Sequence, residues 1–173
     1  MNKTSNHHQP RAQKEAIFAL NQTAIELARL FSCLKQAHWN ARGSTLIKLD
    51  EWAGQIMGHI NHTVERAHTL GYAGEGRVRD KIVMPYLLER TSRSIGGLFD
   101  WLQELLDLHA RASERIRRAV KRLIDVQDFG SADHLADILR TLDLHLWLLE
   151  THLNQQPFKH RNVSPCFTHS LSS

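Results

Sequence analysis

The sequence is poor in residues that interrupt regular structure, with nine glycines and four prolines among 173 residues. It also lacks any long stretch in which Val, Ile or Thr alternate with polar residues, the pattern of a half-buried strand. Only two cysteines, Cys33 and Cys166, are present, which excludes a disulfide framework. These absences predict an all-α protein that resides in the cytosol.

No apolar run near the amino terminus could act as a secretory signal, and no stretch approaches the roughly 18 consecutive apolar residues of a membrane span. We therefore expect a cytoplasmic protein without a membrane segment. The length suits one domain, and 42% hydrophobic residues provide for a sizeable core.

The formal charge of +4 is unevenly distributed, because both ends of the chain carry basic and no acidic side chains. Residues 1–14 and 157–173 are also rich in Asn, Gln, Ser, His and Pro. Such composition predicts two mobile basic arms on either side of a domain at 15–156. The arms could bind a polyanion or merely keep the protein in solution.

Four amphipathic helices are predicted from apolar residues that recur at spacings of three and four. They cover about residues 14–40, 48–70, 91–125 and 131–156, with Ser131 as the expected N-cap of the last. Because the link between the second and third helices is long, we expect a four-helix bundle with one crossover connection.

Several polar residues interrupt these helix faces. His38 continues the apolar stripe of the first helix, at a position where a core residue is expected. On the second helix, Asp50, Asn61 and Glu65 fall within about 60° of arc. Gly54 and Gly58 share this face, where they destabilise a helix unless something approaches the backbone closely.

Imidazole and carboxylate groups together suit iron, because anionic oxygen stabilises the ferric state. His62 lies one turn before Glu65 and could join such a site, as in ferritin-like bundles where ligands three residues apart project together. The alternatives are a core or interface position for His38, a solvated face on the second helix, and chance adjacency among twelve histidines.

Two segments resemble the Dps-like mini-ferritin family, a branch of the ferritin-like superfamily. One is Gln36-Ala37-His38-Trp39-Asn40-Ala41-Arg42-Gly43 together with Glu65-Arg66 and Leu70-Gly71. The other runs from Ser131-Ala132-Asp133 through Leu142-Asp143 and Leu146-Trp147 to Glu150-Thr151-His152-Leu153. The resemblance covers most of residues 15–155 and implies the ferritin-like four-helix bundle.

The resemblance implies a homo-oligomeric, dodecameric shell in the cytoplasm, associated with the nucleoid. Such a shell binds DNA without sequence preference, oxidises Fe(II), preferably with hydrogen peroxide, and stores the iron. The implied site lies between two subunits, where His38 of one faces ligands largely on the second helix of the other. His38, Asp50 and Glu65 match its catalytic metal ligands, and Asn61 and His62 lie beside them.

Two departures from the family pattern bear on this ferroxidase site. The interval from His38 to Glu65 is about one turn shorter than the family's, and its second histidine is missing. Asn61 also stands where an aspartate is usual, so the site has one negative charge fewer. The alternatives are a non-catalytic DNA-binding shell with a degenerate iron site, and a site for zinc or another divalent ion.

The acidic residues Asp128, Asp133 and Asp137 resemble in spacing the aspartates of the family's threefold iron-entry pores. An acidic pore would concentrate cations by its electrostatic field. The simpler alternative is that aspartates near a helix N-terminus are favoured by the helix dipole.

Arginines form a stripe on the third helix at Arg111, Arg115, Arg118 and Arg122, with Arg117 and Lys121 beside it. Phosphate contacts need accessible cations, so this stripe is a candidate nucleic-acid surface. The fold implied by the resemblance favours a solvated or subunit-bridging face instead. For DNA we therefore expect contacts from the arms, which offer Lys3, Arg11, Lys14, Lys159 and Arg161.

Overall fold

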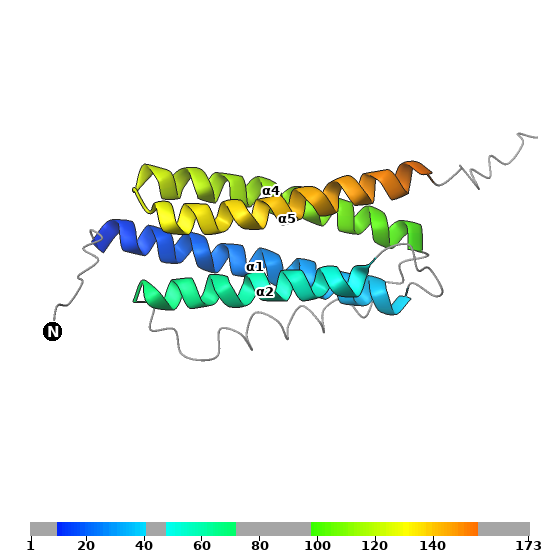
Figure 1. The fold of residues 1–173 in the computed structure, drawn as a ribbon, viewed down its shortest axis with the longest axis horizontal. Coiled ribbons are helices and arrows are strands. Elements are labelled where there is room, and N and C mark those ends of the chain that lie inside the picture. The colour runs from blue at the N-terminus through cyan, green and yellow to red at the C-terminus, as the bar shows by residue number, and fades with distance from the viewer. Residues whose placement is uncertain (1–9, 41–47, 72–97, 156–173) are drawn as a thin grey trace, which may run out of the picture.

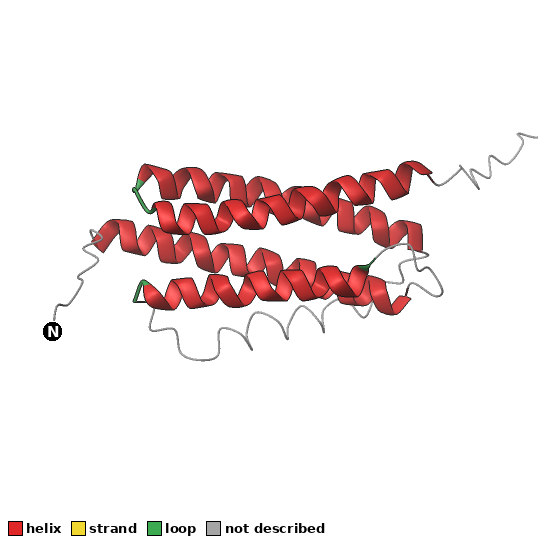
Figure 2. Cartoon of the chain, in the orientation of Figure 1, coloured by secondary structure: helices red, strands yellow, loops and turns green. Residues whose placement is uncertain are grey.

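The computed structural model describes residues 10–40, 48–71 and 98–155, and these form four long helices without a strand (Figure 2). They are α1 (Pro10–Asn40), α2 (Leu49–Thr69), α4 (Leu98–Asp125) and α5 (Phe129–Gln155). The predicted all-α four-helix bundle is confirmed. Residues 10–14, predicted to be part of the amino-terminal arm, belong to α1, and Arg11 and Lys14 are exposed on it.

The helices form two antiparallel hairpins, α1–α2 and α4–α5 (Figure 1). α2 and α4 run in the same direction (Figure 1). The predicted crossover connection falls on residues 72–97, which lie outside the described part of the chain. None of the described helices is long and apolar enough to cross a membrane.

An apolar core runs between the two hairpins and is built largely from the predicted stripes. Leu20, Leu27 and Leu34 of α1 are fully buried, as are the following residues of the predicted stripes on α4 and α5: Leu102, Leu105, Ile116, Leu123, Leu135 and Leu142. The α5 stripe also contains Leu139, Leu146 and Leu153, which are only partly buried. Burial of this much leucine and isoleucine is the main stabilising contribution, at about 25 cal/mol for each Å² removed from water.

Side chains and turns hold the ends of the helices together. Gly71 has φ +89°, a left-handed conformation that residues with a side chain rarely adopt. Its N–H donates to the carbonyl of His68 at 2.9 Å. Gln13 of α1 donates a hydrogen bond from Nε2 to the carbonyl of Leu70. The first turn of α1 is therefore fixed against the last turn of α2.

The start of α5 differs from the prediction. Asp128, and not Ser131, lies at the N-cap, and Oδ1 of Asp128 accepts from the Ser131 N–H at 3.1 Å. The Ser131 hydroxyl donates to Oδ2 of Asp128 at 2.7 Å. Both residue types favour N-caps, so the pattern alone left the start uncertain by one turn.

Candidate metal centre

The five predicted metal ligands lie on α1 and α2, outside the buried core. His38 and Asp50 are exposed in the last turn of α1 and the first turn of α2, whereas Asn61, His62 and Glu65 lie near the end of α2. Of these three only Asn61 is partly buried. The candidates are therefore accessible in the single chain.

His38 does not occupy a core position within the chain, contrary to the expectation from the α1 stripe. The neighbouring Cys33, Leu34 and Ala37 are fully buried, and His38 is exposed. A stripe that repeats every 3.5 residues drifts by about 20° per heptad around a helix of 3.6 residues per turn, so its last member need not stay on the buried face. His38 consequently points away from the core.

His38 and Asp50 are brought close together at one end of the α1–α2 hairpin. Lys35 holds Asp50 there, with 2.6 Å between Nζ and Oδ1. The hydrogen bond and charge of Lys35 lower the pKa of Asp50, and His38 adds a smaller lowering effect. The Lys35 ammonium also lies 5.8 Å from the centre of the Trp39 ring. The carboxylate of Asp50 is thus ionised and already has a cationic partner.

Asp50 and Glu65 share one face of α2 but lie far apart along it. Fifteen residues at 1.5 Å of rise place them about 22 Å apart, so one ion cannot bind both in a single chain. Within the described ranges, no group of three or more His, Cys, Asp or Glu side chains is arranged to hold a metal ion. The candidates therefore form two groups, His38 with Asp50 and Asn61 with His62 and Glu65.

Gly54 and Gly58 lie between these two groups, in the middle of α2. A Cβ built on either glycine would have nothing within 4 Å beyond its own helix backbone. No neighbouring part of the described chain thus requires glycine at these positions. The predicted close approach to the backbone, if it occurs, must come from outside the described part of the chain.

The three predicted pore residues have different environments. Asp128 is 2% exposed and, besides capping α5, accepts a hydrogen bond from Nη2 of Arg66 at 3.1 Å. Asp133 and Asp137 are exposed, and Asp137 pairs with Arg140 at 3.1 Å. Asp128 therefore has a structural role in this chain, whereas Asp133 and Asp137 remain pore candidates.

A row of polar pairs, which the sequence patterns did not predict, joins α2 to α5 and is called here the α2–α5 ladder. Its four contacts span 2.9 to 3.0 Å and join Arg66 to Ser131, Thr63 to His134, His59 to Thr141 and Gln55 to His145. The Thr63 hydroxyl donates to the carbonyl of His59 at 2.7 Å, so it accepts from Nε2–H of His134. Burial lowers the pKa of His59 and His134, which keeps both rings neutral at pH 7.

At one end of the ladder, two fully buried histidines face each other. Nε2 of His109 lies 3.3 Å from Nδ1 of His145, and Nδ1 of His109 lies 2.8 Å from the carbonyl of Leu105. The His145 ring also stacks on Trp52, with centroids 4.3 Å apart. Burial lowers the pKa of His109 to about 4 and that of His145 to about 3.

Because both rings are neutral at pH 7, two ring protons must serve three contacts. The Leu105 carbonyl can only accept, so His109 donates to it and accepts from His145. Nε2 of His145 is then an acceptor. Gln55 must therefore turn its amide NH₂ toward this nitrogen, since the hydrogen-bond network decides which end of the amide faces it. The pair is therefore satisfied without any metal.

Comparison with known proteins agrees with this architecture. Residues 17–157 match the ferritin-like domain family. The DNA protection during starvation protein of Agrobacterium fabrum is 28% identical over 158 residues, which cover 89% of this chain and 97% of the relative. DpsC from Streptomyces coelicolor has a TM-score of 0.74 at 26% identity, over 92% of this chain and 95% of that one.

A second solved structure, that of Dps from Microbacterium arborescens in the high iron form, has a TM-score of 0.64 at 26% identity. The match covers 85% of this chain and 97% of that one. The family match spans most of the chain, and the relatives are matched over almost their whole length. This chain therefore belongs to the ferritin-like family and is a Dps-like mini-ferritin.

Proposed function

We propose that this protein assembles into a Dps-like shell, a dodecamer, that oxidises ferrous iron, stores the ferric product and protects DNA in the cytoplasm. The division of the candidate ligands into two accessible groups at opposite ends of α2 carries this proposal. One of the relatives was solved in a high iron form, and another is named for DNA protection.

A second copy of the chain would complete the iron site. If α2 of that copy ran antiparallel to the first, His38 and Asp50 of one copy would meet Asn61, His62 and Glu65 of the other. Gly54 and Gly58 lie midway between the groups, where two helices could approach most closely. In this arrangement each iron site takes one ligand group from each copy. Asp50 therefore acts together with His38 of its own chain.

The proposed reaction uses iron as substrate. Two ferrous ions give one electron each to one molecule of hydrogen peroxide, whose O–O bond breaks. With two protons the peroxide becomes two water molecules, and the ferric ions pass to the mineral. Asp50 and Glu65 supply the anionic oxygen that favours ferric over ferrous iron. The reaction removes both reactants that would otherwise form hydroxyl radicals.

The test compares Glu65→Gln with Asn61→Asp in the assembled protein. Glu65→Gln removes a charge with little change of shape and should abolish most of the peroxide-driven Fe(II) oxidation. Asn61→Asp adds a carboxylate one turn from Glu65 and should speed oxidation and give Fe(II)-dependent thermal stabilisation. Without an iron site, the added carboxylate would only repel Glu65 and destabilise α2. No gain in rate and no stabilisation by Fe(II) would contradict the ferroxidase proposal.

A second candidate function is a non-catalytic shell that protects DNA by binding it. The neutral side chain of Asn61 and the ion pair that holds Asp50 favour this candidate. It predicts DNA binding without turnover of Fe(II) by either peroxide or oxygen. Zinc at His38, His62 and Glu65 is the remaining alternative, and metal analysis of the purified shell distinguishes it from iron.

A further inference from the structure

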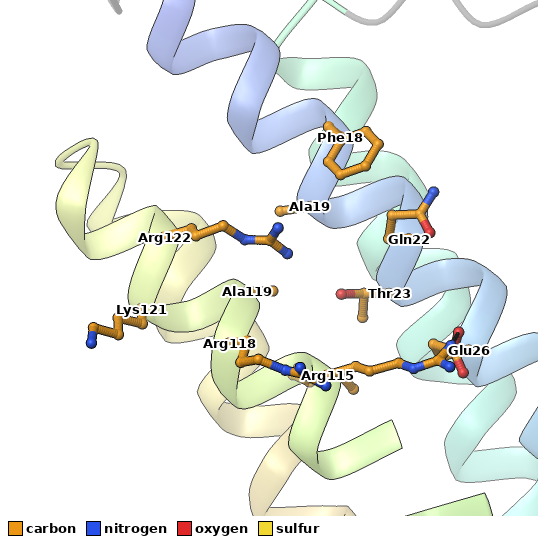
Figure 3. A pocket seen from close by; sticks show the side chains of 11 residues that line it. Phe18, Ala19, Gln22, Thr23, Glu26, Arg115, Arg118, Ala119, Lys121 and Arg122 are labelled. Atoms are coloured by element: carbon orange, nitrogen blue, oxygen red, sulfur yellow. Dashed lines mark hydrogen bonds and ion pairs between the residues drawn. The ribbon is translucent and has the colours of Figure 1, made fainter. Parts of the chain in front are cut away.

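A groove of about 560 Å³ lies between α1 and α4, and none of the candidate metal ligands lines it. We call it the α1–α4 groove. Its floor includes the small side chains Ala19 and Ala119, which let the two helices approach (Figure 3). Phe18 lies at its rim with 53% of its surface exposed. The groove thus has an apolar base and an exposed aromatic ring at one edge.

The groove is strongly basic. Four cations line it, namely Arg115, Arg118, Lys121 and Arg122, against the single carboxylate of Glu26. Glu26 pairs with Arg115 and also with Arg29, so its charge is already shared. Arg118 has only a weak, exposed contact with Glu114 at 3.6 Å. Lys121 and Arg122 form no ion pair in the described part of the chain. Three cations are therefore available to an anionic ligand.

We propose that the α1–α4 groove binds the sugar–phosphate backbone of duplex DNA. In this arrangement Arg118, Lys121 and Arg122 contact phosphates, and Phe18 contacts the deoxyribose. The proposal rests on the DNA-protecting function proposed above and names its contact surface. Guanidinium groups bind phosphate oxygens in a bidentate manner. A duplex strand offers such phosphates at regular intervals, so neighbouring cations on one helix can each find a partner.

The dimensions of the basic stripe suit this partner. From Arg118 to Arg122 the three available cations span about 6 Å along α4, which equals about two nucleotides of one strand. All three available cations project from one rigid helix, so they lose less conformational freedom on binding than cations on a flexible arm would. Two arm candidates, Arg11 and Lys14, instead lie on α1 outside the groove lining.

The experiment compares two variants of the assembled protein that each lack three cations. The groove variant is Arg118→Gln/Lys121→Gln/Arg122→Gln, and the matched control is Lys3→Gln/Arg11→Gln/Lys14→Gln. Binding to a short duplex of mixed sequence is measured over a range of salt concentrations. The groove variant should bind on the order of tenfold more weakly, and its salt slope should fall by about 0.9 for each phosphate that is no longer neutralised. The control should keep the wild-type slope.

Three results would overturn the proposal: an unchanged groove variant, equal weakening of DNA binding in both variants, or disassembly of the groove variant in sedimentation. Disassembly would mean that a second copy of the chain occupies the groove. Fe(II) oxidation should be unchanged in both variants. If the wild-type shell itself fails to bind DNA at any salt concentration, the proposed DNA function fails as well. If the wild-type shell and the groove variant bind DNA equally well, the groove is not the contact surface, and the proposed DNA-protecting function still stands.

A measurement on the wild-type shell removes any dependence on variants. An amine-specific acetylating reagent should modify Lys121 in the free shell, and bound duplex DNA should slow this reaction more than that at Lys48, an exposed lysine at the start of α2. A Lys121 that reacts equally fast with and without DNA contradicts the proposal. A Lys121 that is unreactive in the free shell shows that the groove is covered by another copy, which also contradicts it.

Discussion

Lys35 of α1 donates a hydrogen bond to Asp50 of α2, with 2.6 Å between Nζ and Oδ1. The contact joins the two helices at the end of the hairpin where His38 also lies. A cation that holds a carboxylate in this way competes with any metal ion for the same oxygen. In the proposed iron site, the pair should therefore affect iron binding more than it affects folding, because exposed ion pairs contribute little to stability.

Lys35→Gln should consequently speed Fe(II) oxidation at limiting iron. The substitution releases the Asp50 carboxylate and removes a positive charge that repels the metal. Initial rates with hydrogen peroxide provide the measurement, and thermal unfolding should change little. The control is Lys48→Gln, which removes an equal charge from a pair with Glu51 at 3.0 Å in the same turn of α2. If both substitutions raise the rate equally, the effect is one of general charge and not of Asp50.

The two glycines of α2 allow a test of the subunit interface. If no second copy covers the face of α2 that carries the glycines, Gly54→Ala/Gly58→Ala should stabilise the fold by about 1 kcal/mol for each substitution. If a second α2 approaches the bare backbone, the added methyl groups should instead shift the assembly to smaller species. Sedimentation and thermal unfolding distinguish these results. Stabilisation with an unchanged assembly would place the iron-site interface elsewhere.

The buried histidine pair predicts a dependence of stability on pH. A histidine in the unfolded chain titrates near 6.5, whereas burial lowers the pKa of His109 to about 4. Between these values the unfolded chain binds more protons than the folded one, so the free energy of unfolding falls as the pH falls. The contribution is fully present above about pH 6.5 and, for His109, is on the order of 3 kcal/mol.

His145→Phe should weaken this pH dependence. The phenyl ring can still stack on Trp52 but takes up no proton. One group that titrates in the acid pH range is therefore removed. Thermal unfolding followed from neutral to acid pH provides the measurement. His68→Gln, at an exposed position on α2, is the control and should leave the dependence as it is. An identical pH profile for His145→Phe and wild type would show that the pair does not govern acid stability.

Substitution of the acidic residues near α5 should separate structural from pore roles. Burial alone would raise the pKa of Asp128, but the hydrogen bonds from Ser131 together with the charge and hydrogen bond of Arg66 lower it. Asp128→Asn should therefore destabilise the fold by roughly 1–3 kcal/mol, as expected for a buried cap and ion pair. Asp133→Asn/Asp137→Asn should leave unfolding nearly unchanged and slow iron uptake by the intact shell. Unchanged uptake would argue against the pore.

Local periodicity predicted the helices well but could not predict contacts between distant segments. Residues one heptad apart, such as Leu102, His109 and Ile116, stay on one face because seven residues fall only about 20° short of two turns. A histidine within such a stripe is a signal that could have revealed the buried pair. The α2–α5 ladder joins residues that are remote in sequence, so no local pattern reveals it. The pairing of the two ligand groups depends on a second chain and is likewise absent from local patterns.

The α2–α5 ladder also determines how the two hairpins are aligned along their length. Leucines recur almost every turn on α5, so sliding α5 past α2 by one turn, about 5.4 Å, would exchange one apolar contact for a similar one. The polar pairs have no such degeneracy, because the same shift would separate Gln55 from His145 and Arg66 from Ser131 together. Buried polar groups left without partners are costly, at about 1–3 kcal/mol each. The ladder therefore selects one longitudinal register of α5 against α2 among several that the apolar core alone would tolerate.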